Sequence, residues 1–460
     1  MNTRTRIAPS PTGVDLHIGN AYTALINYIV AKQKKGTFIV RIEDTDRTRL
    51  VSGSEERILE SLHWLGLDPN ESPHTGGPFA PYRQSERLAL YKKYAEQLVE
   101  AGYAYYCFCT PERLEAMRKD QEGHHQAPRY DGTCRKLKTQ NSKLKAEQGE
   151  KHIVRLKVPK EGVTKFTDLI RGEISFKNAL IDDQVLLKSD GFPTYHLGVV
   201  VDDHLMEISH IIRGEEWISS TPKHILLYSY FGWNPPVYAH MPLLRNPDKT
   251  KLSKRKNPVW ISWYRKEGYL PQALLNYLAT LAWAFPGGRE VFNLEEMIHE
   301  FKLNDIQTTA PIFNIDKLRW MNGEYIRKTE ILKFKTQISN FFHKRYNPET
   351  IERVWPLVKD RIKTIVEFEM MADFFFMRPK KFERPVDRKL ISIVKLSLSG
   401  CQWRHDAMEQ ALRTSADVSG IKAKDIFMEL RIAVTGKTVG PPLLESLEIL
   451  GKDETLTRLS

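Results

Sequence analysis

Cysteine is scarce in this sequence, which has four cysteines in 460 residues. Cys107, Cys109 and Cys134 lie near one another, and Cys401 stands alone. Cysteines so few and so spaced do not form the disulfide framework of a secreted scaffold, and they point to a reduced compartment. Long apolar runs are also lacking, because the longest, around 274–285, is too short and interrupted to span a bilayer. With no apolar leader at the N-terminus, the sequence predicts an unprocessed cytoplasmic protein without a membrane partner.

Acidic residues are outnumbered by basic ones, with 57 Asp and Glu against 69 Lys and Arg and a net charge of +12. Such a surplus attracts polyanions, so nucleic acid is a candidate partner, although many cytosolic enzymes carry a similar surplus on solvated surfaces. The hydrophobic content of 41% and charged content of 27% are typical of globular proteins. A chain of this length is expected to have about three domains.

The first hundred residues alternate between strand and helix patterns. Residues 4–8 indicate a strand, turn residues follow at 9–13, a helix begins near Ile18, and 38–42 indicate a second strand. This order is typical of the opening of a doubly wound parallel sheet of the Rossmann type. In such α/β sheets ligands bind beyond the carboxyl ends of the strands, where the turn and the acidic residues 43–46 would both lie.

The middle of the chain interrupts this alternation and then resumes it. After a helix, a segment of changed composition from 103 to 183 is predicted to be an α+β insertion, and everything beyond 325 has the pattern of amphipathic helices. The predicted elements are a helix at 85–101, strands at 153–158 and 184–187, a helix at 195–203, a strand at 207–213, and helices at 219–231, 351–368 and 407–415.

Two short motifs have chemistry suited to a nucleotide. At His17-Ile18-Gly19-Asn20 the imidazole can donate to a phosphate oxygen, Gly19 permits close backbone approach, and the helix that starts there directs free N–H groups at an anion. Alone this motif is weak, because a polar residue before a glycine at a helix start is more often a cap.

The second motif is the basic loop at 248–256, which has five cations in nine residues. Concentrated positive charge can hold the β- and γ-phosphates of ATP as the transition state develops, and the loop could close over the bound nucleotide. On charge alone, a solvated loop or a contact to a nucleic-acid backbone is the simpler interpretation. Only the pairing of the two motifs favours catalysis.

Several further segments make the chain resemble the class I aminoacyl-tRNA synthetases, and within them the glutamyl branch. The resemblance is dense over about the first 325 residues and looser in the helical remainder. The segments are RIAPSPTG at 6–13, RIEDTD at 41–46, YRQS at 82–85, PTYH at 193–196, IRGEEW at 212–217, HMPLL at 240–244 and YLPQALLNYL at 269–278.

The resemblance implies an enzyme that activates L-glutamate with ATP and Mg²⁺ and transfers it to tRNA(Glu). In this site two arginines would bind the side-chain carboxylate, Glu43 would hold the α-amino group, and Tyr195 would donate a hydroxyl. The implied glutamate-binding residues are Arg6, Ala8, Ser10, Glu43, Tyr195 and Arg213. The sequence leaves open an ordinary ion pair between Arg213 and Glu215 or Glu216.

The same resemblance implies an ATP site. His17 and Lys254 are the catalytic candidates, and Lys254 is the residue most directly linked to the departure of pyrophosphate. The implied ATP-binding residues are His17, Gly19, Glu216, Leu244, Lys251, Leu252, Ser253, Lys254 and Arg255. Two positions depart from the family pattern: Asn20 stands where a second histidine is common, and Val199 where some relatives have a polar asparagine, so neither is assigned that role.

The cysteine group of the insertion resembles the zinc knuckle of some relatives, which use three thiolates and a histidine. Lys136 stands at the histidine position here and cannot replace it as a neutral nitrogen donor. A closed site of four ligands with Cys107, Cys109 and Cys134 therefore requires Tyr130, His124 or His125 as the fourth ligand. The alternative is a knuckle without metal.

The helical C-terminal region is suited to reading unstacked anticodon bases, and the resemblance places Arg361 where it would distinguish glutamate tRNA from glutamine tRNA. The chain is expected to act as a monomer. The predicted domains are a catalytic domain at 1–100 and 191–245, an acceptor-stem-binding insertion at 101–190, a stem-contact region with the KLSKR loop at 246–325 and an anticodon-binding region at 326–460.

Four other functions remain as alternatives. A glutaminyl enzyme is expected to have a β-rich anticodon region, and a shortened relative that modifies a tRNA base would lack that region. A non-catalytic tRNA-binding relative would not need intact His17, Lys254 and Arg213. A small-molecule nucleotidyltransferase would not explain the basic surplus or the long helical tail.

Overall fold

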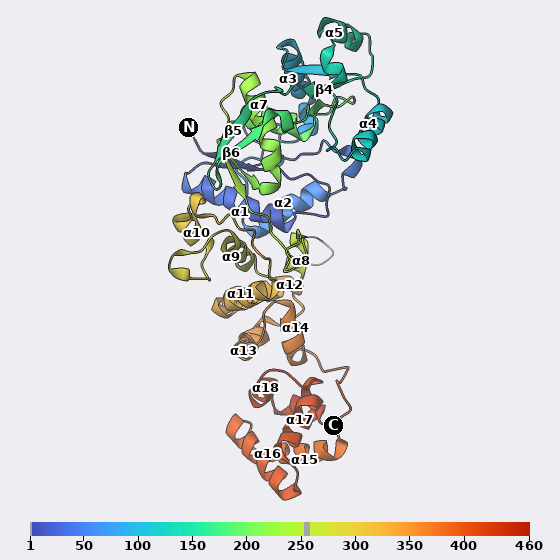
Figure 1. Ribbon diagram of the computed structural model, residues 1–460. Coiled ribbons are helices and arrows are strands. Elements are labelled where there is room, and N and C mark those ends of the chain that lie inside the picture. The colour runs from blue at the N-terminus through green and yellow to red at the C-terminus, as the bar shows by residue number, and fades with distance from the viewer. Residues whose placement is uncertain (1, 138, 253–257) are drawn as a thin grey trace. The chain divides into compact units, whose positions relative to one another are not determined.

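The computed structural model describes residues 2–137, 139–252 and 258–460 (Figure 1). It divides into two compact units. Unit 1 consists of Met1–Trp263 and Leu275–Asn314, and unit 2 consists of Tyr264–Leu274 and Ile315–Ser460.

Unit 1 is built on parallel strands, as predicted. Strand β1 (Arg4–Ile7) pairs in parallel with β2 (Thr37–Val40), and helix α1 (Ile18–Gln33) connects them. A second sheet has the order β6-β5-β9-β8, in which β5 and β8 run parallel to β9 and only β6 is antiparallel. Its strands are β5 (Val163–Asp168), β6 (Gly172–Lys177), β8 (His210–Gly214) and β9 (Val237–Met241).

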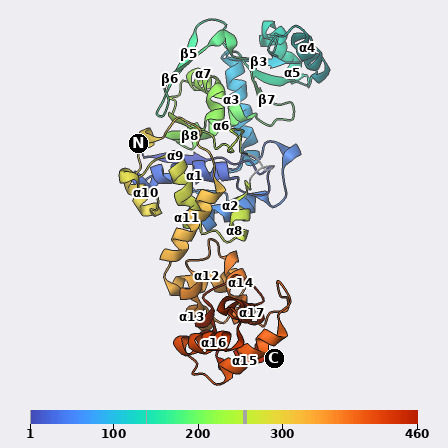
Figure 2. The same cartoon turned by 60° about the horizontal axis from the view of Figure 1, so that its bottom comes forward.

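The two sheets adjoin along β1 and β8. Next to β8, the backbone N–H of Ser209 donates to the carbonyl of Arg4 in β1 at 3.0 Å. Helix α7 (Thr221–Phe231) packs against β5, as the two views of the ribbon show (Figures 1 and 2). The other helices in this part are α2 (Ser54–Leu65), α3 (Leu88–Glu100) and α6 (Tyr195–Leu205). The predicted Rossmann-type α/β fold class is confirmed.

Close backbone packing fixes the return from α1 to β2. At Gly36, which follows the last helical turn, a Cβ atom would lie 2.0 Å from the carbonyl oxygen of Thr3. Only glycine allows that approach. This contact sets the strand order, since the N–H of Thr37 then donates to the same carbonyl oxygen at 2.8 Å.

The insertion contains the two predicted short strands, at 153–158 and 184–187, together with one strand, β3 (Ala104–Cys107), and one hairpin that were not predicted. Strands β3, β4 (Ile153–Leu156) and β7 (Val185–Leu187) form an antiparallel sheet. Helices α4 (Pro111–Gly123) and α5 (Thr139–Glu147) flank it. The hairpin β5–β6 instead joins the central sheet beside β9. It was missed because its strands are only six residues long and each has only two large apolar residues, Val163 and Phe166 in β5 and Ile174 and Phe176 in β6.

Helices also make up the rest of unit 1 and all of unit 2, with the boundary passing through α8 and α9. In unit 2, α15, α16 and α17 pack together around Val394, Leu412 and Leu430, while Phe334, Trp355 and Phe368 lie in another core (Figure 2). The helices are α8 (Ile261–Lys266), α9 (Pro271–Ala282), α10 (Leu294–Glu300), α11 (Ile315–Lys328), α12 (Ile331–Phe341), α13 (Pro348–Val358), α14 (Val366–Ala372), α15 (Arg388–Ser399), α16 (His405–Ser419), α17 (Ala423–Thr435), α18 (Leu443–Leu450) and α19 (Lys452–Arg458).

The prediction of one helix at 351–368 is wrong. Helix α13 ends at Val358 and α14 begins at Val366. Between them, backbone groups form hydrogen bonds with residues far away in the sequence instead of with the next helical turn. The N–H of Ile365 donates to the carbonyl of Gly268 at 2.9 Å, and the amide of Asn322 donates to the carbonyl of Lys363 at 2.5 Å. No helix in the described part of the chain is long and apolar enough to cross a membrane.

Candidate active site

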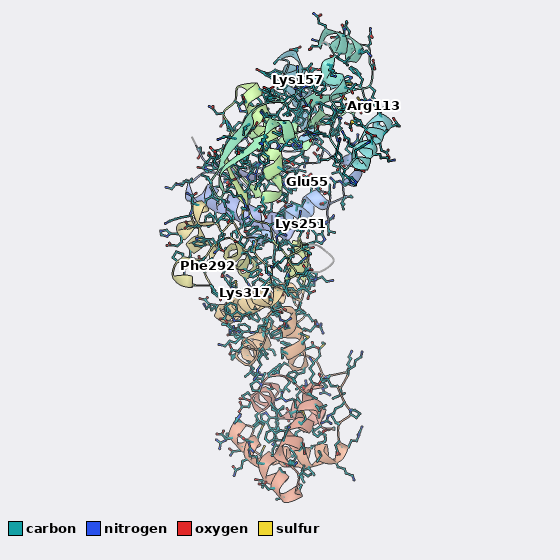
Figure 3. The ribbon with its side chains drawn as sticks, viewed as in Figure 1. Glu55, Arg113, Lys157, Lys251, Phe292 and Lys317 are labelled. Carbon is teal, nitrogen blue, oxygen red and sulfur yellow. The ribbon has the colours of Figure 1, made fainter. Side chains whose placement is uncertain are left out.

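A cavity of about 350 Å³ lies at the carboxyl ends of the parallel strands in unit 1. It contains most of the residues predicted for glutamate and ATP. The predicted residues that line it are Arg6, Ala8, His17, Gly19, Glu43, Tyr195, Arg213, Glu216, Leu244, Lys251 and Leu252, of which Lys251 is labelled in Figure 3. Ser10 is exposed and does not line the cavity. Ser253, Lys254 and Arg255 lie outside the described residues.

His17 is both a helix cap and a member of the cavity wall. Its Nδ1 accepts a hydrogen bond from the backbone N–H of Gly19 at 3.0 Å, so the ring proton is on Nε2. The first turn of α1 brings backbone N–H groups to the same end of the cavity. Capping, which was the simpler interpretation of this motif, therefore fixes the tautomer that a phosphate-binding role requires.

The loop before α1 is held from the other side by Trp260. A Cβ atom on Gly13 would lie 2.2 Å from that indole ring, so glycine is required there. The same indole meets the His17 imidazole edge-on, with 5.7 Å between the ring centroids. The N–H of Ile18 donates to the carbonyl of Val259 at 2.7 Å, which fixes the start of the helix.

Arg213 is buried, with 6% of its surface exposed, yet within the described ranges it has no carboxylate partner. Its guanidinium donates to the hydroxyls of Tyr195 at 3.0 Å and Thr221 at 2.9 Å, and to Nε2 of His240 at 3.1 Å. Nδ1 of His224 lies 3.4 Å from both terminal nitrogens. The cation is thus held by neutral acceptors.

The alternative, a pairing of Arg213 with Glu215 or Glu216, does not occur among the described residues. Glu215 instead accepts from Arg171 at 2.6 Å and from the N–H of Leu243 at 3.1 Å. Arg213 and Tyr195 both line the cavity. Arg213 is therefore placed to accept a negatively charged ligand group as its counter-ion.

Arg6 is balanced differently, because Asp203 holds it with two hydrogen bonds of 3.1 and 3.0 Å. The same carboxylate accepts from Arg41 at 2.8 Å, and Arg41 donates to Glu43 at 3.2 Å. Burial raises the pKa of Glu43 to about 7, although Arg41 and Arg6 oppose this rise. The cavity thus has a carboxyl group, Glu43, and an unbalanced cation, Arg213, a combination suited to a ligand that carries an ammonium and a carboxylate.

The three cysteines of the insertion also come together. Their Sγ atoms lie within 4.8 Å of one another, and those of Cys109 and Cys134 are 3.5 Å apart. The hydroxyl of Tyr130 is 3.4 Å from Cys107 Sγ and 3.3 Å from Cys109 Sγ. Arg113 of α4, labelled in Figure 3, donates to Cys109 Sγ at 3.2 Å.

Of the candidate fourth ligands, only Tyr130 lies beside the thiols. His124 and His125 are exposed and do not belong to the metal-ligating group found among the described residues. The three thiols and the phenol are separated by distances close to those between the ligands of a small tetrahedral ion, so the donor set fits zinc.

In unit 2, Arg361 is exposed just beyond α13. Arg431 lines a nearby cavity of about 400 Å³, together with Arg413 and Phe427. Burial lowers the pKa of Arg431, and the charge of Arg361 lowers it further. Arg413 also lies over the ring of Phe427, 5.8 Å from its centroid.

A family model described as tRNA synthetases class I (E and Q), catalytic domain, matches residues 2–320. The chain belongs to the class I tRNA synthetases. A second model, described as an anticodon binding domain, matches residues 329–460.

Curated relatives of this class I tRNA synthetase share its whole length. A glutamate–tRNA ligase of Acinetobacter baumannii is 47% identical over 100% of this chain and 93% of its own. One from Acidothermus cellulolyticus is 45% identical over 100% and 95%. A crystal structure of a glutamate tRNA ligase from Elizabethkingia meningosepticum, in complex with its amino acid, matches with a TM-score of 0.87 and 36% identity, covering 100% of this chain and 98% of that one.

The cavity of this class I tRNA synthetase also contains residues that were not predicted, including Tyr22, Thr23 and Trp217. The hydroxyl of Tyr22 is buried and has no hydrogen-bond partner among the described residues. Tyr22 follows Gly19 by three residues, about one helical turn, so the sequence could have indicated that both residues face the same side of α1. His240 belongs to the family segment HMPLL, but its pairing with Asp168 behind Arg213 had no signal, because 72 residues separate the two.

Proposed function

We propose that this chain is a glutamate–tRNA ligase. In the first step, the α-carboxylate of L-glutamate attacks the α-phosphorus of ATP and pyrophosphate leaves. In the second, a hydroxyl of the 3′-terminal adenosine of tRNA(Glu) attacks the acyl carbon and AMP leaves. The observation that carries this proposal is the cavity in which Glu43 and the carboxylate-free Arg213 lie beside a capped helix N-terminus.

Each end of glutamate has a matching group in the cavity. The side-chain carboxylate would bind Arg213 and the Tyr195 hydroxyl and supply the missing counter-ion. The α-ammonium would bind Glu43, with Ala8 beside it. Arg6 could contribute its remaining terminal nitrogen, since Asp203 occupies the other side of that guanidinium.

ATP would lie across the start of α1. The Nε2–H of His17 and the free N–H groups of the first helical turn would hold phosphate oxygens, and the close approach at Gly19 would leave room for the nucleotide. Lys251, and with it the sequence positions Ser253, Lys254 and Arg255, would bind the departing pyrophosphate, while Mg²⁺ enters with ATP as part of the substrate. We assign the largest catalytic effect in this loop to Lys254.

Zinc is proposed as a structural ion of the insertion, held by Cys107, Cys109, Cys134 and Tyr130. The support is the fourfold donor set, in which the Tyr130 hydroxyl takes the place of the histidine used by some relatives. In unit 2, Arg361 and the basic cavity beside it are proposed to read the anticodon. We also propose the cytoplasmic location and monomeric state that the composition predicts.

A glutaminyl enzyme is disfavoured by two observations. The anticodon-binding region is helical rather than β-rich, and a neutral glutamine side chain would leave Arg213 without a counter-ion. The relatives quoted above are glutamate–tRNA ligases.

The proposal is tested by charging tRNA with labelled amino acid. The purified chain, supplied with ATP and Mg²⁺, is expected to attach glutamate but not glutamine to tRNA(Glu), and to exchange pyrophosphate into ATP in a glutamate-dependent reaction with tRNA present. Lys254→Ala should lower the exchange rate at least a hundredfold while the KM for glutamate changes less than threefold, because a cation that stabilises the transition state acts mainly on kcat. Absence of glutamate-dependent exchange and charging in the wild-type chain would refute the function.

A further inference from the structure

Behind Arg213, outside the cavity, lies a fully buried pair formed by Asp168 and His240. His240 is at the end of β9 and Asp168 at the end of β5, in the turn of the β5–β6 hairpin. Nδ1 of His240 is 2.6 Å from one carboxylate oxygen of Asp168, and the backbone N–H of His240 donates to the same oxygen at 3.0 Å. The other oxygen accepts from the backbone N–H groups of Ile170 and Arg171, both at 3.0 Å.

These bonds determine which nitrogen of His240 has the proton. Asp168 accepts at both oxygens, so Nδ1 of the imidazole must donate, and Nε2 presents its lone pair. That lone pair faces the Nε–H of Arg213 at 3.1 Å. A hydrogen-bonded chain therefore runs from the hairpin turn through His240 to the arginine that faces the substrate.

The charge states fit this direction of donation. Burial lowers the pKa of His240, so the ring is neutral at physiological pH and can accept. Burial is the largest single influence on the pKa of Asp168 and raises it, but His240 and the backbone N–H groups of Ile170 and Arg171 together leave that pKa below its ordinary value. His224, the other imidazole beside Arg213, also has a pKa far below its usual range, first because of burial and then because of Arg213 itself.

A second contact anchors the hairpin turn to the same part of the site. Arg171 donates to the backbone carbonyl of His240 at 3.1 Å and to Glu215 at 2.6 Å. Glu215 in turn accepts from the N–H of Leu243, beside the predicted ATP contact Leu244. The turn thus fixes β9 at the point where its backbone enters the cavity wall.

We propose that Asp168 and His240 are positioning residues for amino-acid recognition, which hold the Arg213 guanidinium in the plane and orientation that receives the substrate side-chain carboxylate. The proposal rests on the proposed function of Arg213 as the glutamate-binding cation. Neither residue lines the cavity, so the pair acts through Arg213, which Nε2 of His240 contacts directly and through the Thr221 hydroxyl at 3.2 Å.

Two substitutions of similar size separate positioning from packing. In His240→Gln the amide can donate to Asp168 and accept from Arg213, whereas the apolar side chain of His240→Leu does neither. We expect His240→Leu to raise the KM for glutamate at least tenfold above that of His240→Gln, with the KM for ATP and the kcat changed less than threefold in both. A residue that only filled space would tolerate leucine at least as well as glutamine.

A matched control removes a carboxylate from the same hairpin without touching the pair. Glu173 is exposed on β6 and pairs with Lys165 at 2.9 Å. Glu173→Gln is expected to leave the KM for glutamate within twofold of the wild-type value. Equal KM values for His240→Gln and His240→Leu would overturn the proposal.

The tautomer provides a readout that does not depend on activity or on the folding of a variant. In ¹⁵N spectra of histidine-labelled wild-type protein, His240 should show a protonated Nδ1 and an unprotonated Nε2, assigned by the loss of its signals in His240→Gln or, failing that, by their proximity to Asp168 in the wild type. A ring protonated at Nε2, or at both nitrogens at pH 7.5, would refute the positioning chain whether or not the protein charges tRNA. Failure of charging with the expected tautomer would instead count against the proposed function.

Discussion

Arg6 and Arg213 line the same cavity on neighbouring strands, but different groups balance their charges. Asp203 neutralises Arg6, whereas hydroxyls and imidazoles surround Arg213. A buried cation without an anion has an unfavourable free energy of several kcal/mol, part of which a bound carboxylate recovers. The two arginines look equivalent in the sequence, and only the structure distinguishes a structural ion pair from a site that lacks an anion.

Glu43 gives a prediction for pH dependence. Its pKa of about 7, raised by burial against the opposing charges of Arg41 and Arg6 and aided by Asp203, means that the empty site loses its negative charge as the pH falls below 7. The KM for glutamate should therefore rise about tenfold per pH unit below pH 7 and become constant above pH 8. Pyrophosphate exchange measured from pH 5.5 to 8.5 tests this.

The control for that measurement is Glu43→Gln, which should give a high KM with little dependence on pH. A wild-type KM that stays constant down to pH 5.5 would contradict the assignment of the α-amino group to Glu43. The sign for stability is opposite to that for binding: because the folded protein holds the proton more tightly than the unfolded chain, this group lowers the free energy of unfolding as the pH rises from about 4.5 to 7.

Among the elements, those with strong local signals were predictable. Helix α1 has its cap at His17 and its turn at Gly36, β2 is a compact apolar run, and β1 is followed at once by turn residues, so their positions could be inferred to within a few residues. The break between α13 and α14 could not, because bonds from Ile365 and Lys363 to distant residues override a continuous helical pattern. The β5–β6 hairpin was missed for a related reason, since its role depends on β9.

The cysteine knuckle gives a prediction at the level of one element. We expect the protein, purified without added zinc, to contain one zinc per chain. Tyr130→Phe should weaken zinc binding at least tenfold because it leaves three ligands, and Cys134→Ser should weaken it more. Metal analysis after dialysis against a graded chelator measures both.

The matched control is Cys401→Ser, which removes the cysteine of unit 2 and should leave the zinc content unchanged. Protein that contains no zinc, and takes up none when it is supplied, would show that the knuckle folds without metal. Zinc binding by Tyr130→Phe at the wild-type level would instead reject the phenol as the fourth ligand.

For the whole molecule, the sequence could predict the members of the site better than their arrangement. Residues as far apart as Arg6 and Leu252 line one cavity because parallel strands end at the same edge of the sheet. This rule, with the family motifs, was enough to bring most of the predicted residues together. It did not predict that Ser10 is exposed, that the Tyr22 hydroxyl has no hydrogen-bond partner among the described residues, or that Asp168 and His240 pair behind Arg213. These features depend on side-chain packing.

Discrimination between tRNAs is expected to involve the other unit. If Arg361 and the adjacent cavity read the anticodon, Arg361→Ala should reduce the preference for tRNA(Glu) over tRNA(Gln), measured as the ratio of kcat/KM for charging, by about ten- to a hundredfold, which corresponds to about 1–3 kcal/mol for one recognition contact. Glutamate-dependent pyrophosphate exchange with saturating tRNA(Glu) should change little.

Arg388, at the start of α15, is a suitable control position, and Arg388→Ala should leave the preference unchanged. Equal charging of both tRNAs by the wild-type chain would contradict the role of Arg361. A loss of charging with both tRNAs in Arg361→Ala, with the ratio preserved, would indicate a contact to the phosphate backbone instead.

The β5–β6 hairpin limits how freely parts of this enzyme can be exchanged with relatives. It lies within the stretch of sequence that looks like an independent insertion, yet its turn supplies Asp168 and Arg171 to the group of residues behind the cavity. A chimaera that replaced the whole of 101–190 would therefore also replace the support of Arg213. A chimaera that replaced only 101–160 would keep the native β5–β6 hairpin and with it the residues that support Arg213. The boundary for such an exchange therefore lies inside the insertion predicted at 101–190 and not at its ends.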